Sequence, residues 1–208
     1  CRHLIRRYMK QHRRIIFNGD GYSAQWVQEA ERRGLPNIPC MVDAIAVLTA
    51  PKNVELFEKF HIFNQSELES RSEVLYENYA KVINIEAQTM LHMASKHYIP
   101  AVIRYCGELA TSINAMRSAC PGMELDTQEQ LLRRVNALLQ QASENHAHLA
   151  QVTEYAHSLA EGEAAARAFR EQVVPAMQAL RAAVDKMELL VNKAYWPVPT
   201  YGDLMFEV

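Results

Sequence analysis

Histidines are the residues of this chain best suited to bind a transition-metal ion, and the chain has eight of them. Neutral imidazole is a common ligand of zinc, copper and iron. The spacing does not favour a shared site: His92 and His97 are five residues apart and His146 and His148 are two apart, so neither pair shares a face of an α-helix. Three others stand singly: His12, His61 and His157. No H-E-x-x-H motif or paired E-x-x-H arrangement is present, and we predict surface or packed histidines rather than metal ligands.

Glu86 differs from the other carboxylates because it lies in the apolar run 82–87, V-I-N-I-E-A, and we expect it to be partly buried. A buried carboxylate is a candidate for acid–base chemistry. No second acid, base or nucleophile accompanies it in the sequence. We therefore favour a structural ion pair or hydrogen bond, with one of three cations as the partner: Lys81, Lys96 or Arg104.

The stretch N-G-D-G-Y at 18–22 is a strong turn signal that resembles a phosphate-binding loop only loosely. It has neither G-x-x-x-x-G-K-S/T nor G-x-G-x-x-G, so a turn between two helices explains it. Ser23 is placed to cap a short helix that runs to Arg33, with Gly34 just past its end.

Nucleophiles in a reactive context are also missing from the sequence. No serine lies in G-x-S-x-G. The cysteines show no C-x-x-C spacing and predict reduced thiols: Cys1, Cys40, Cys106 and Cys120. Taken together, these patterns predict no catalytic, cofactor-binding or metal-binding residue in this chain.

The first 17 residues form a basic segment with no acidic residue before Asp20. Its cations are Arg2, Arg6, Arg7, Lys10, Arg13 and Arg14. An apolar stripe runs beside them at helical spacing: Leu4, Ile5, Tyr8 and Met9. Cations of this density can contact nucleic acid or a nucleotide phosphate. No pattern of aromatic side chains interleaved with these cations supports nucleic-acid binding. We favour a solvated face or a docking surface for an acidic neighbouring domain.

Composition predicts an all-α protein. The 208 residues are 49% apolar and 22% charged, with few Gly and Pro and many Ala, Leu, Glu, Gln and Met. The net charge of −2 implies no overall attraction to nucleic acid or to anionic lipid. No apolar run is long enough to span a membrane and no signal-peptide core is present, so we expect a cytoplasmic protein. A chain that starts at Cys1 in a helical pattern suggests a piece of a longer polypeptide.

Three regions follow from the pattern along the chain. Residues 1–65 contain short helices and turns that continue from an upstream domain, with helices expected near 41–48 and 53–60. Residues 66–195 form a bundle of long antiparallel helices. Its first helix begins with a capping box at Ser66 and Glu69 and runs to about Met116, bent at Pro100.

A coiled-coil-like hairpin is predicted at about 128–194. A second capping box at Thr127 and Gln130 starts it, Gly162 marks the turn, and Pro175 is expected to bend the second arm. Two apolar seams repeat in steps of three and four. They are Leu131, Val135, Leu138, Ala142, Asn145, Leu149, Val152, Ala156 and Leu159, then Ala166, Phe169, Val173, Ala176, Leu180, Ala183, Met187, Leu190 and Ala194. Asn145 is a polar residue on a seam, where it can fix the register.

The final region, 196–208, reads W-P-V-P-T-Y-G-D-L-M-F-E-V. Pro197 and Pro199 favour an extended backbone. The segment is too apolar for a free end. We therefore expect an extended tail that docks on its own domain or on a neighbour.

This tail resembles the closing segment of the type III glutamine synthetases. Two other stretches resemble the same family in the same order: F-N-G-D-G-Y-S-A-Q-W-V at 17–27 and Y-A-K-V-I-N-I-E-A at 79–87 with Met90. The resemblance implies the helical C-terminal region that follows the catalytic domain of a glutamate–ammonia ligase. It also implies ATP and Mg²⁺ or Mn²⁺ in the full-length enzyme, a cytosolic homo-oligomer, and a fragment that is inactive alone. We carry over no catalytic residue, and the expected partners are the upstream catalytic domain and sister subunits.

Two other interpretations stay open from the residues alone. One is a stand-alone helical hairpin that serves as an interaction or adaptor module without catalysis. The other is a small helical-bundle enzyme or ligand-binding domain, which requires inward-facing polar clusters. Few such residues are apparent beyond Asn84, Glu86 and Asn145.

Overall fold

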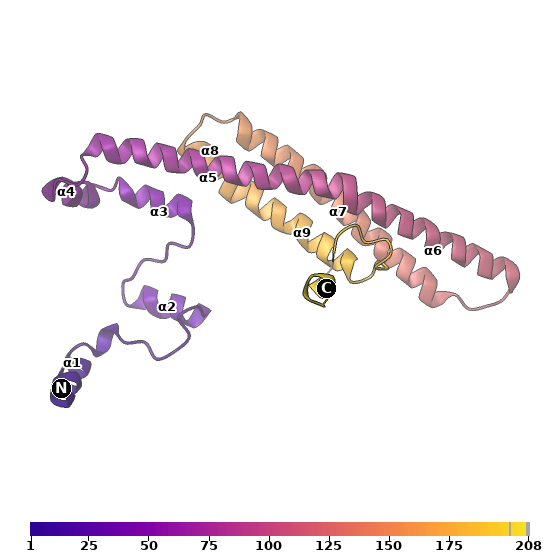
Figure 1. Cartoon of the computed structure of the whole chain (residues 1–208), viewed down its shortest axis with the longest axis horizontal. Helices are drawn as coiled ribbons and strands as arrows, with labels where there is room; N and C mark the ends of the chain where they lie inside the picture. The colour runs from indigo at the N-terminus through magenta and orange to yellow at the C-terminus, as the bar shows by residue number, and fades with distance from the viewer. Residues whose placement is uncertain (200, 207–208) are drawn as a thin grey trace. The chain divides into compact units, whose positions relative to one another are not determined.

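The computed structural model describes residues 1–199 and 201–206, and these contain helices but no strand (Figure 1). The predicted all-α class is confirmed. No helix within the described ranges combines the length and apolarity needed to cross a lipid bilayer. The chain divides into two compact units, Cys1–Ala44 and Ile45–Val208.

The first unit contains short helices joined by turns. They are α1 (Arg2–Gln11), a 3₁₀ turn η1 (Arg13–Ile15), α2 (Ala24–Arg32) and the start of α3 (Met41–Leu48). Ser23 caps α2 as predicted, since its hydroxyl accepts a hydrogen bond from the Trp26 amide at 3.3 Å. Gly34 ends this element with a φ of 75°, a conformation that glycine adopts without strain.

A continuous helical rod dominates the second unit. After α4 (Pro51–Lys59), α5 (Gln65–Met93) leads through the π-helical segment η2 (Ala94–Tyr98) into α6 (Ile99–Ala119). The predicted capping box at Ser66 and Glu69 is wrong by two residues. Asn64 accepts from the Glu67 amide at 2.9 Å and the Glu67 carboxylate accepts from the Asn64 amide at 2.8 Å. Asn is as good an N-cap residue as Ser. The two overlapping capping-box patterns, 64–67 and 66–69, differ only in which residue has the extended backbone that precedes the helix.

The predicted hairpin is present as α7 (Asp126–Ser158) and a second arm made of α8 (Glu163–Ala168), the π-helical η3 (Phe169–Val173) and α9 (Val174–Glu188). Gly162 lies between the arms with a φ of 102°. Both arms lie along the rod of α5 and α6 (Figure 1). The shared core holds most seam residues from both arms, with Val135, Leu149, Phe169, Leu180 and Met187 deeply buried.

Three details of the hairpin differ from expectation. The capping box at Thr127 and Gln130 is wrong, because α7 begins at Asp126 after Leu125 and no side chain caps it. Leu125, the residue before the helix, is buried. The negative charge of Asp126 in the first turn interacts favourably with the helix dipole. The second arm ends at Glu188, and Ala194, predicted to continue the seam, is exposed.

Each proline inside a long helix follows a π-helical segment. η2 ends two residues before Pro100, and η3 ends two residues before Pro175. A proline lacks the amide that would bond to the carbonyl four residues earlier, and its ring crowds that carbonyl. The wider π turn accommodates both effects, so the helix continues past each proline. The bends expected at Pro100 and Pro175 stay predictions.

The expectation of an extended tail is wrong for Tyr201–Phe206, which form the short helix α10. This stretch follows both prolines, so no ring blocks helical hydrogen bonds there, and Asp203 lies in its first turn. The expectations for Thr200, Glu207 and Val208 lie outside the described residues, as does the Tyr201 side chain.

Candidate functional site

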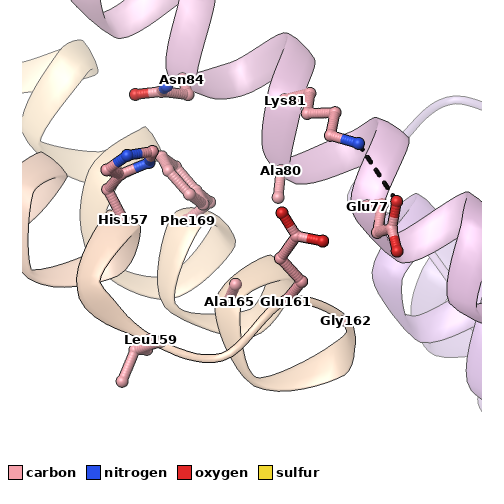
Figure 2. A pocket seen from close by; sticks show the side chains of 10 residues that line it. All are labelled: Glu77, Ala80, Lys81, Asn84, His157, Leu159, Glu161, Gly162, Ala165 and Phe169. Atoms are coloured by element: carbon pink, nitrogen blue, oxygen red, sulfur yellow. Dashed lines mark hydrogen bonds and ion pairs between the residues drawn. The ribbon is translucent and has the colours of Figure 1, made fainter.

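A pocket of about 130 Å³ lies where the turn of the hairpin faces α5 (Figure 2). From α5 it is lined by Glu77, Ala80, Lys81 and Asn84. From the hairpin it is lined by His157, Leu159, Glu161, Gly162, Ala165 and Phe169. Helix α5 contacts α8 here, so the pocket lies within the second unit.

Charges of both signs meet in this pocket. Lys81 Nζ donates to Glu77 Oε2 at 3.1 Å, and the Glu161 carboxylate points into the space below Ala80 and Lys81 (Figure 2). Asn84 Oδ1 is buried without a hydrogen-bond partner among the described residues. A pocket of this size with polar side chains in its lining has room for a few water molecules. The lining contains no nucleophile with a base beside it, so the geometry suits hydration or a small polar molecule rather than catalysis.

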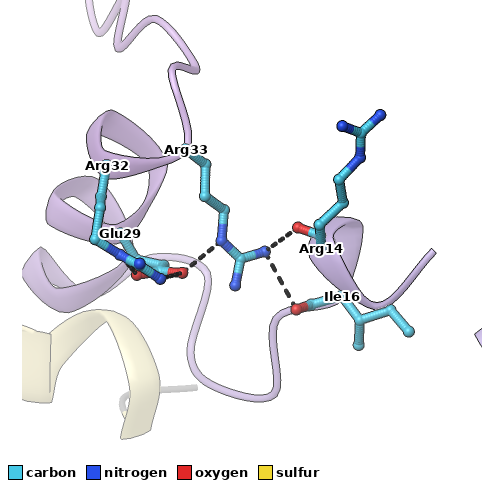
Figure 3. Close-up of polar contacts among 5 residues, drawn as sticks. All are labelled: Arg14, Ile16, Glu29, Arg32 and Arg33. Carbon is cyan, nitrogen blue, oxygen red and sulfur yellow. Dashed lines mark hydrogen bonds and ion pairs between the residues drawn. The ribbon is translucent and has the colours of Figure 1, made fainter. Parts of the chain in front are cut away.

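A second polar cluster forms around Arg33 in the first unit (Figure 3). Arg33 donates to Glu29 Oε1 at 2.5 Å and to the backbone carbonyls of Arg14 at 2.9 Å and Ile16 at 3.2 Å. Hydrogen bonds from Arg32, and then from Arg33, lower the pKa of Glu29 to about 2. These contacts tie the segment after α1 to α2 and give the cluster a structural role.

Aromatic contacts reinforce the Arg33 cluster. The Phe17 and Trp26 ring centroids are 4.7 Å apart, and the Arg33 guanidinium lies 5.9 Å from each. A Cβ at Gly19 would lie 2.6 Å from the Phe17 ring, so glycine permits this packing. The stretch 18–22 is a turn, in which the Asp20 carboxylate accepts from the Tyr22 amide at 2.9 Å.

Glu86 is exposed, so the expectation of a partly buried carboxylate is wrong. The heptad spacing turns Ile83 and Ala87 toward the core and leaves Glu86 on the outer face of α5. Lys81, one of its expected partners, pairs with Glu77.

The geometry of His92 and His97 also differs from expectation. Their ring centroids are 6.0 Å apart at an interplanar angle of 72°, because the π-helical η2 brings residues five apart onto one face. His146 is half-buried, and its Nε2 lies 3.1 Å from the Leu91 carbonyl oxygen. Among the described residues no three His, Cys, Asp or Glu side chains are grouped to hold a metal ion.

The tail docks on its own unit at one end. Trp196 is 8% exposed and its ring lies 5.2 Å from that of Tyr98, while Tyr195 lies 5.6 Å from Tyr105 and donates to Glu108. Burial raises the pKa of the Tyr98 and Tyr105 hydroxyls, which keeps them neutral.

The other end of the tail is apolar and exposed. In α10, Leu204, Met205 and Phe206 are 70%, 67% and 78% exposed. Asp203 pairs with Lys193 and holds this helix near the anchored segment. The tail is therefore packed on its own unit at Trp196, whereas Leu204, Met205 and Phe206 are exposed in this chain, and their docking on a neighbour stays a prediction.

Sequence reasoning missed two features of these sites. Arg33 gave a weak signal through its four-residue spacing from Glu29. The approach of His92 to His97 had none, because a π turn is not visible in spacing.

Comparisons with known proteins give one consistent result. A family model described as the glutamine synthetase C-terminal domain matches residues 1–117. The type-3 glutamine synthetase of Dictyostelium discoideum is 32% identical over 98% of this chain and 28% of its own length. The glutamine synthetase of Butyrivibrio fibrisolvens is 30% identical over 99% of this chain and 29% of its own length. That of Bacteroides fragilis is 28% identical over 92% and 27%, so the chain spans less than a third of these relatives.

Proposed function

The chain belongs to the family of glutamine synthetase C-terminal domains, and from that membership we propose that it braces the catalytic part of a type III enzyme and contributes to its assembly. The complete enzyme would join ammonia to glutamate with ATP and Mg²⁺ or Mn²⁺. Its partners would be the upstream catalytic domain and sister subunits in the cytoplasm, without nucleic acid or membrane.

No step of that reaction is assigned to this chain. Within the described ranges, no group of three potential ligands could hold a metal ion, and the pocket at the hairpin turn has no nucleophile–base pair. ATP and the divalent ions would be held by residues of the catalytic domain. The stand-alone adaptor gains no support from the relatives, which are all glutamine synthetases.

The single observation that carries the proposal is the division of the tail. Trp196 fixes the start of the tail in the core, while Leu204, Met205 and Phe206 expose adjacent apolar side chains. Exposed apolar residues grouped in this way indicate a protein–protein contact. The basic helix α1 supports the same view, since Leu4, Ile5, Tyr8 and Met9 are all about half exposed or more.

Deletion of residues 196–208 from the complete enzyme tests the proposal. We expect a lower Tm and a smaller or less stable oligomer, measured by scanning calorimetry and by light scattering after size exclusion. An enzyme that keeps both its oligomeric state and its Tm after this deletion would contradict the proposal.

Two variants separate the anchoring of the tail in the core from its docking on a partner. Trp196→Ala should destabilise the fold by about 3–5 kcal/mol, the usual cost of emptying a large aromatic site. The triple change Leu204→Ser, Met205→Ser and Phe206→Ser should weaken assembly while helical content and the stability of the isolated 208-residue chain stay the same.

The control is Leu189→Ser, because Leu189 is 84% exposed but outside the tail. Leu189→Ser should change neither the assembly of the enzyme nor the stability of the isolated 208-residue chain. If the triple variant assembles like the control, the exposed end of the tail has no docking role.

A further inference from the structure

Two exposed imidazoles come together on the rod of α5 and α6, outside every site described above. His92 lies at the end of α5 and His97 lies within η2, and their ring centroids are 6.0 Å apart. Both side chains are exposed, so solvent and ions reach them.

The pairing depends on the local winding of the helix. In an α-helix, residues five apart point in different directions. A π turn closes hydrogen bonds between residues five apart, which brings their side chains to the same face. The segment Ala94–Tyr98 has this winding, and Pro100, two residues after its end, lacks an amide that α-helical winding would need.

The chemistry of the pair selects the kind of ion. Imidazole suits late first-row transition metals, whereas Mg²⁺, Ca²⁺ and Mn²⁺ prefer carboxylate and carbonyl oxygens. No acidic side chain joins the two histidines in a three-residue group within the part of the chain that the structure describes. The site therefore offers two nitrogen ligands and leaves the other coordination positions to water.

We propose that His92 and His97 together bind one late first-row transition-metal ion, of the class of Cu²⁺, Ni²⁺ or Zn²⁺, and that the ion clamps the π-helical segment. Two ligands on one helical face must keep their spacing while the ion is bound. The bound ion thus opposes fraying or rewinding of Ala94–Tyr98, and it stabilises the folded chain over the unfolded one. This site is independent of the docking role of the tail.

The test is a titration of the 208-residue chain with NiCl₂, and separately with ZnCl₂, by isothermal calorimetry. The background carries Cys1→Ser, His3→Gln and Cys120→Ser, so that exposed thiols and the histidine near the amino terminus do not compete. We expect one ion per chain. His92→Gln and His97→Gln should each lower the affinity at least about tenfold, since loss of even an outer-shell partner costs that much.

The double variant should bind the ion no more weakly than either single variant does, because one remaining imidazole does not form the two-ligand site. His148→Gln is the matched control, as His148 is also an exposed helical histidine. Saturating Ni²⁺ should raise the Tm and slow amide exchange at Ala94–Tyr98 in the background chain and in His148→Gln only.

Affinities within twofold of the background for both single variants, or an equal loss in His148→Gln, would overturn the proposal. Circular dichroism of each variant confirms that it is folded before the titration. If a glutamine variant unfolds, His92→Asn or His97→Asn replaces it.

Discussion

Arg33 is the residue on which the polar contacts of the first unit converge. It bonds to Glu29 and to two backbone carbonyls, and it lies over two aromatic rings. The carbonyls belong to the segment after α1, which has no buried side chain of its own. One guanidinium therefore provides the long-range connection that apolar burial does not.

The pKa of Glu29 gives a test of this cluster at the scale of the residue. The hydrogen bonds from Arg32 and Arg33 lower it from 4.5 to about 2. A carboxyl with a lowered folded-state pKa stabilises the fold at pH values above its unfolded-state pKa. That contribution disappears as the pH falls from about 4.5 toward 2, because the protonated carboxyl cannot accept both charged donors.

We expect carboxyl ¹³C NMR to show Glu29 titrating with a midpoint near 2. Arg33→Met should move this midpoint up toward the ordinary glutamate value, and Arg33→Lys should move it less because the charge is kept. A midpoint near 4.5 in the unaltered chain would mean that the Arg33 cluster does not form in solution.

At the scale of the element, winding changes at two matched positions. η2 and η3 are each five residues long and each ends two residues before a proline. In both cases the buried residues on either side, such as Ala87 and Val102 or Ala168 and Leu180, stay in the core. The π turns thus preserve the packing of two long helices that each contain an internal proline.

Two glycines in the second unit make a matched pair for testing these elements. Gly162 joins the arms of the hairpin with a φ of 102°, a backbone region that is strained for other residues. Gly107 lies inside α6, where an added Cβ meets nothing within 4 Å.

Gly162→Ala should destabilise the chain by about 1–3 kcal/mol. Gly107→Ala should stabilise it by up to about 1 kcal/mol, because alanine loses less conformational freedom in a helix. Urea unfolding followed by circular dichroism measures both changes. Equal effects of the two substitutions would show that the turn at Gly162 differs from the one described.

At the scale of the whole molecule, the two units differ in how much they bury. The second unit has a continuous core that runs from Ala80 to Trp196. In the first unit only two residues count as buried apolar side chains, Ala30 and Val42. A segment this short with so small a core does not fold stably alone.

Truncation tests this difference. A chain that begins at Met41 should keep cooperative thermal unfolding and its helical content. A peptide of residues 1–40 should be unfolded by circular dichroism, and limited proteolysis of the 208-residue chain should cut there first. A cooperative transition in the peptide would contradict the assignment of the core to the second unit.

The sequence alone determined the all-α class, the long rod, the hairpin with its two seams and the docking of Trp196. These follow from local patterns: steps of three and four residues place Val135 and Leu149 on one stripe of α7, and Leu180 and Met187 on one stripe of α9, wherever those helices lie. Asn145 belongs to this pattern too, and its amide donates to the Ala179 carbonyl in the facing arm at 3.0 Å.

Tertiary structure decided the rest. The N-cap of α5 at Asn64 rather than Ser66, the exposure of Glu86 and the helix α10 depend on where neighbouring segments lie. The approach of His92 to His97 and the contacts of Arg33 with the segment after α1 depend on it as well. The spacing of residues along a chain indicates which of them share a face of a regular helix. It does not indicate whether a segment takes α or π winding, or which distant segment packs against it in the core.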